Sequence, residues 1–143
     1  MSEIETFLTH DGVKYAATIV TIESTSLGRE DHGIWQAMLY VGWGGCGTGV
    51  GGFALDGQPN RNVPPGDKRT PTAYGLQWII EATETVCGEC GRWESLPGKQ
   101  CFMLHDADSG PYDRAGFNCK GIASLDGKRV MVFDDVAAHA GEQ

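Results

Sequence analysis

The stretch VKYAATIVTIEST at residues 13–25 decides the fold class of this chain. It is dense in β-branched residues, which favour an extended backbone, and the turn-forming pair Asp11-Gly12 precedes it. A polar stretch at residues 26–33, which contains Gly28, follows it and is expected to be a loop. We therefore predict a first strand at residues 13–25.

A second strand is expected after this loop, at residues 35–43. Side chains alternate between the two faces of a strand, so Trp35 and Trp43 fall on the same face together with other apolar residues. We expect this tryptophan face to point into the core.

The next segment, GCGTGVGG at residues 45–52, has a glycine at every second position. If the segment is extended, one of its faces is bare, with Gly47 and Gly49 at its centre. Two interpretations remain open. Either the bare face packs beneath an aromatic ring or another backbone, or it forms the floor of a pocket for a planar ligand.

One helix is expected from Pro71 to Val86. Apolar residues recur there at helical spacing, Thr70 precedes the segment as a candidate N-cap, and proline suits the first helical position. Gly88 suits the end of this helix.

Further strands are expected after the helix, and Asp126-Gly127 predicts a two-residue hairpin between the last pair. These strands span residues 99–105, 117–125 and 128–133. Strands on both sides of one helix indicate an α+β fold. We predict one α+β domain over residues 1–143, in which a mainly antiparallel sheet of five or six strands packs against the helix.

Composition narrows the function classes. The chain has 143 residues, which suits one domain, and its formal net charge is -8. This charge argues against a nucleic-acid binder, because phosphate contacts need a basic surface. No apolar run reaches the ~20 residues that cross a bilayer, and the N-terminal residues do not resemble a signal peptide, so an intracellular protein that does not bind membranes is expected. The sequence leaves the oligomeric state open.

The sequence does not support either of two common nucleotide-binding motifs, the dinucleotide-binding turn and the P-loop. The pattern G-x-G-x-x-G occurs at Gly42, Gly44 and Gly47, but a dinucleotide-binding turn needs a helix directly after it, and the expected helix begins much later. No lysine followed by serine or threonine completes a P-loop there.

Four cysteines are candidate ligands of a structural zinc ion. Cys87 and Cys90 have the Cys-x2-Cys spacing with which a tight turn holds one ion. Cys101 and Cys119 can complete a four-sulfur site, or His105 can replace one of the sulfurs. The alternative is that these cysteines are ordinary reduced thiols.

Glu30, Asp31 and His32 place two carboxylates and an imidazole in one loop. A neighbouring carboxylate can raise the pKa of a histidine or orient its ring for proton transfer. The alternative is a solvated turn, because three adjacent residues cannot all point into one pocket.

Four short elements of the chain, in this order, resemble a family of small uncharacterised proteins found in many tailed-phage genomes. The elements are Glu30 to Gly33, Gly51 to Asp56, Ala73 to Gly75 and Trp93 to Gly98. The resemblance covers residues 22–99 and implies a phage origin and a role in the host cytoplasm, with no activity that can be carried over. The Cys87/Cys90 pair departs from the family pattern, which makes any zinc site a local addition.

Two function classes follow from these observations. The favoured one is a phage-encoded accessory protein that blocks or sequesters a host protein or a small host signalling nucleotide. Its site would combine residues 30–32 with the tryptophans and glycines that follow: Trp35, Trp43, Gly47 and Gly49. The alternative is a small hydrolase or transferase in which His32 works with Glu30 or Asp31 as an acid-base pair.

Overall fold

The computed structural model describes residues 6–29, 33–57, 70–89, 91–108 and 118–136. Seven strands form one antiparallel sheet, and two short strands form a second. The large sheet contains β1 (Thr6–His10), β2 (Val13–Arg29), β3 (Trp35–Trp43), β4 (Cys46–Val50), β7 (Gln100–Asp106), β8 (Gly121–Ala123) and β9 (Val130–Val132). The small sheet pairs β5 (Asp56–Gly57) with β6 (Thr70–Pro71). The chain also contains α1 (Ala73–Cys87), the 3-10 helix η2 (Trp93–Ser95) and a helical turn at residues 133–136 after β9.

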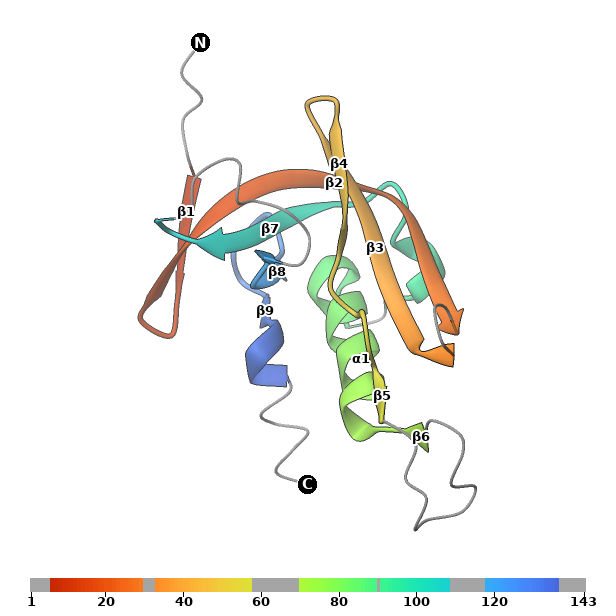
Figure 1. The fold of residues 1–143 in the computed structure, drawn as a ribbon. Coiled ribbons are helices and arrows are strands. Elements are labelled where there is room, and N and C mark those ends of the chain that lie inside the picture. Colours follow the sequence, from red (N-terminus) through yellow and green to blue (C-terminus); the bar gives the residue numbers. More distant parts are fainter. Residues whose placement is uncertain (1–5, 30–32, 58–69, 90, 109–117, 137–143) are drawn as a thin grey trace.

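The 17-residue strand β2 organises the large sheet. Its first half pairs with β1 on one edge and with β7 on the other, and its second half pairs with β3. The strand order is β4-β3-β2-β7-β8-β9, with β1 beside β2. A register shift between Ile22 and Ser24 marks a bulge, which bends a strand. In Figure 1, β2 is a long curved ribbon, and α1 lies under the concave side of the sheet.

The core lies between the concave face of the sheet and α1. Trp78 of α1 is completely buried there, and its ring centroid lies 5.7 Å from that of Phe133. The core also contains aliphatic residues from the central strands: Val20, Ile22, Leu39, Val41, Met103 and Ile122. Apolar burial of this kind is the main source of folding free energy.

The α+β fold with a mainly antiparallel sheet and one main helix is confirmed. The sheet has more strands than the expected five or six, because β1 lies before the first predicted strand and pairs with it through the turn at Asp11-Gly12. The expected loop at residues 26–33 was partly wrong, because residues 26–29 continue β2 and pair with β3. On β3, Ala37, Leu39 and Val41 are buried, so the tryptophan face points inward as predicted.

The helix begins two residues later than the sequence predicted. Thr72, not Thr70, is the N-cap: its backbone is extended and its side-chain oxygen accepts a hydrogen bond from the N–H of Gly75. Thr70 and Pro71 instead pair with Asp56 and Gly57 in the small sheet. The predicted end is confirmed, since Gly88 caps the helix with a positive φ.

The β8–β9 hairpin is confirmed, but its turn is longer than two residues. The strands stop pairing at Ala123 and Val130. Within the turn, the carboxylate of Asp126 accepts hydrogen bonds from the Ser124 hydroxyl and the Lys128 N–H. The side-chain network adds to a backbone hydrogen bond of 2.9 Å from the Ser124 N–H to the Arg129 carbonyl oxygen, and together they hold the turn. Among the residues that the structure describes, no helix is long and apolar enough to span a membrane.

Candidate ligand-binding site

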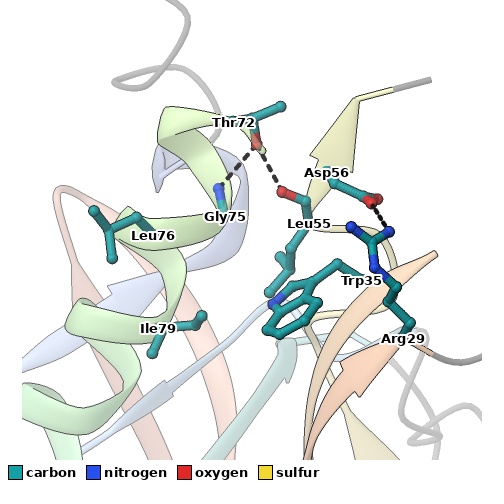
Figure 2. Close-up of a pocket in the computed structure, with 8 residues that line it drawn as sticks. All are labelled: Arg29, Trp35, Leu55, Asp56, Thr72, Gly75, Leu76 and Ile79. Atoms are coloured by element: carbon teal, nitrogen blue, oxygen red, sulfur yellow. Dashed lines mark hydrogen bonds and ion pairs between the residues drawn. The ribbon is translucent and has the colours of Figure 1, made fainter. Parts of the chain in front are cut away.

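A pocket of about 290 Å³ lies between the first two turns of α1 and the end of the β2–β3 hairpin (Figure 2). We call it the Arg29 pocket. Its apolar wall consists of Trp35, Leu55, Leu76 and Ile79, and its charged side chains are Arg29 and Asp56. Thr72 and Gly75 complete the described lining.

Arg29 lies at the rim of this pocket. Its Nη1 donates a hydrogen bond to the carbonyl oxygen of Gly33 at 3.1 Å and lies 3.7 Å from Oδ2 of Asp56. Its Cζ lies 6.0 Å from the centroid of the Trp35 ring. The Arg29 side chain is 55% exposed and that of Asp56 only 4%, so a buried carboxylate holds a cation that still faces solvent.

The strand pairing brings Arg29 and Trp35 together. They are opposite each other in the β2–β3 register, and side chains of directly opposed residues lie on the same face of a sheet. Because β2 continues to Arg29, this end of the hairpin extends past the residues that pair with β7. The hairpin end therefore forms one wall of the pocket.

The segment around Leu55 closes the pocket between β3 and α1. The N–H of Leu55 donates to the carbonyl oxygen of Trp35 at 2.9 Å, and the hydroxyl of Thr72 donates to the carbonyl oxygen of Leu55 at 2.6 Å. A Cβ on Gly75 would collide with that same carbonyl oxygen, so glycine is what lets α1 approach this closely. Thr72 and Gly75 therefore fix the position of Leu55 in the pocket wall. Asp56 is the next residue in the chain, so its position is restricted as well.

The α1 side of the pocket is unusually apolar for a solvent-facing surface. Leu76 is 63% exposed and Ile80, one turn further along, is 41% exposed. Exposed apolar side chains that border a pocket are typical of a binding surface.

The structure divides the predicted site residues between the two ends of β3, and Trp43 and Gly47 together line a second pocket. Trp35 lines the Arg29 pocket, whereas Trp43 lies at the other end of β3, about 26 Å away at roughly 3.3 Å per residue. Gly47 pairs with Gly42 near that far end. Trp35 and Trp43 therefore do not belong to one small-molecule site.

The glycine segment forms β4 as expected, but its bare face is not open at Gly49. The Met38 methyl group would lie only 2.7 Å from a Cβ at this position, and the Tyr40 ring would lie 3.4 Å away. The packed interpretation therefore holds at Gly49.

Glu30, Asp31 and His32 lie outside the described residues, so their predicted role stays a hypothesis. The residues on either side are described: Arg29 lines the pocket and is hydrogen-bonded to Gly33.

The zinc prediction also stays a prediction, since Cys90 lies outside the described residues. Cys87, Cys101 and Cys119 are not gathered closely enough to share an ion; the group of possible metal ligands among the described residues is His10, Asp11 and Asp135. Burial raises the pKa of Cys101 and of Cys119 to about 12.

Trp35 was predicted from the sequence as a site residue, whereas Arg29 and Asp56, which also line this pocket, were not. Asp56 ends the glycine-rich element, so its place in the sequence was noted, but its pairing with Arg29 depends on tertiary structure. Comparisons of the chain with protein-family models, with curated proteins and with solved structures find no match.

Proposed function

We propose that this protein binds and sequesters a small planar ligand in the Arg29 pocket without changing it chemically. The observation that carries the proposal is the pairing of an aromatic ring, Trp35, with a partly exposed guanidinium, Arg29, over an otherwise aliphatic pocket. Small-molecule sites are typically concave and mostly apolar, with a few fixed polar groups. Trp35 offers a stacking surface, and Arg29 fixes the orientation of the ligand.

The size of the pocket supports a small molecule. Its volume of about 290 Å³ lies just below the range of roughly 300–1,000 Å³ that is typical of ligand pockets. A single ring system with a short substituent suits this space better than a dinucleotide does.

This proposal selects one of the two partner classes expected from the sequence, the small host signalling nucleotide. We also propose that the protein is a phage-encoded accessory protein, which lowers the free concentration of its ligand in the host cytoplasm. The enzyme alternative depends on His32 with Glu30 or Asp31, and it remains a hypothesis about residues outside the described ones.

A protein partner is the second candidate, because Leu76 and Ile80 are exposed on one face of α1. A partner that covers these side chains would also cover the mouth of the Arg29 pocket, which Leu76 lines. Replacing Leu76 by Lys would then weaken partner binding more than replacing Trp35, which is half-buried.

Native mass spectrometry tests the proposal. The purified protein is incubated with the small-molecule fraction of a bacterial extract and compared with Arg29→Gln and Trp35→Leu. Trp43→Leu is a matched control, since Trp43 is also a half-buried tryptophan on the inner face of β3. We expect wild type and Trp43→Leu to retain a small molecule of unchanged mass and the two pocket variants to lose it. A ligand retained equally by all four proteins, no retained ligand, or a ligand converted to a product would contradict the proposal.

A further inference from the structure

Resting on the proposed function, we propose that the ligand is a nucleoside monophosphate, with its base in the apolar slot beside Trp35 and its single phosphate on Arg29. The pocket divides into two parts that correspond to the two parts of such a molecule. The inner part is formed by Trp35, Leu55 and Ile79, and the rim carries the guanidinium.

The inner part suits a base. Leu55 is buried, Trp35 and Ile79 are half-buried, and Figure 2 shows Ile79 of α1 across the pocket from the indole ring. A planar ring placed between an indole and aliphatic side chains gains stacking and apolar burial at once. Stacking on an aromatic side chain tolerates every base, so we expect the slot to select a flat ring and not one particular base.

The rim suits an anion. An arginine has five N–H donors, and the Gly33 carbonyl oxygen takes one hydrogen bond from Nη1. The 3.7 Å separation between Arg29 and Asp56 is longer than a charge-assisted hydrogen bond of about 2.7–2.9 Å, so their contact is a loose ion pair. Donors of the exposed guanidinium therefore remain for a phosphate oxygen.

The charge of the site limits the ligand to one phosphate. Among the described residues that line the pocket, Arg29 is the one cation, and the Asp56 carboxylate beside it offsets part of its charge. The whole chain carries a formal charge of -8, which repels polyanions. Each further phosphate adds negative charge without adding a cation, so affinity should fall from the monophosphate to the triphosphate.

Isothermal titration calorimetry with AMP, adenosine and ATP tests this assignment on the full-length protein. The variants are Arg29→Gln, Trp35→Leu and the matched control Trp43→Leu, each checked for folding by circular dichroism. We expect AMP to bind roughly tenfold more tightly than adenosine, as a charge-assisted contact of about this strength implies, and ATP to bind more weakly than AMP. Arg29→Gln should lower AMP affinity to that of adenosine and leave adenosine affinity unchanged. Trp35→Leu should weaken both compounds, and Trp43→Leu neither.

The outcomes separate this inference from the proposed function. If adenosine and AMP bind equally and both depend on Trp35, the pocket binds planar ligands but the phosphate assignment is wrong. The assignment is also wrong if ATP binds more tightly than AMP, or if no purine compound binds while an extract ligand still requires Trp35. If nothing binds in a Trp35-dependent manner, the inference and the proposed function both fail.

Discussion

At the scale of single residues, Asp56 has two opposing effects on the Arg29 pocket. Its buried carboxylate holds the guanidinium in place, and its negative charge also opposes an incoming anion. The Gly33 carbonyl oxygen also holds Arg29, through a hydrogen bond of 3.1 Å, so we expect the repulsion to be the larger of the two effects of Asp56 on anion binding.

Replacing Asp56 by Asn should therefore tighten AMP binding by roughly two- to fivefold, with a larger gain for ATP, because the variant removes one negative charge near the phosphate. Calorimetric titrations of the wild type and the variant at the same salt concentration measure this effect. Weaker AMP binding by the variant would mean that Asp56 acts mainly by positioning Arg29.

Cys101 and Cys119 make stability depend on pH above neutrality. Burial raises the pKa of each thiol to about 12, whereas a thiol in the unfolded chain titrates near about 8.5. Above that lower pKa the unfolded state binds fewer protons than the folded state, so the stability present below it is lost as pH rises. From pH 7.5 to about 9.5 we expect the free energy of unfolding to fall by about 1 kcal/mol per thiol.

Urea unfolding at the two pH values measures this loss. Cys46→Ala serves as the control, because Cys46 is exposed and its removal should leave the decline unchanged. Cys101→Ala should be less stable at both pH values but should show a smaller decline between them. A wild-type protein that is equally stable at both would show that the buried thiols do not titrate as described.

At the scale of elements, the sequence predicted the strands and the helix whose side-chain patterns lie within one short stretch of the chain. Residues 13–25 and 35–43 have side-chain patterns that fit strands regardless of what they pack against, and both strands form. The start of α1 was misplaced because Thr70 and Thr72 are equally good caps from sequence alone, and pairing with β5 removes Thr70 from the choice. The Arg29–Asp56 contact joins residues far apart in the chain, so no local sequence pattern predicts it.

Thr72 links the stability of α1 to the shape of the pocket. Its hydroxyl accepts from the Gly75 N–H at 3.1 Å and donates to the Leu55 carbonyl oxygen at 2.6 Å. Thr72→Ala should lower the free energy of unfolding by about 1–2 kcal/mol, because a helix cap and a second hydrogen bond are lost together. Thr72→Ser keeps the hydroxyl and should recover most of this loss in urea denaturation; equal destabilisation by both variants would show that the methyl group, not the hydroxyl, matters.

At the scale of the whole molecule, the site is built where the sheet extends beyond the core. The end of β2 and the start of β3 continue past β7, and the Leu55 segment connects them to α1. The glycine-rich strand, which the sequence marked as part of the site, mainly extends the sheet at the opposite end of β3. The acidic surface charge of the chain then selects against large polyanions at a distance.

The central claim is that a planar ligand occupies the Arg29 pocket beside Trp35. The four tryptophans each carry one indole N–H, and their signals can be followed separately by ¹H–¹⁵N NMR during addition of AMP. We expect the Trp35 signal to shift progressively to saturation while the signal of Trp43, at the other end of β3, stays in place. A saturable shift of Trp43 without Trp35, or no shift of either signal, would contradict the claim.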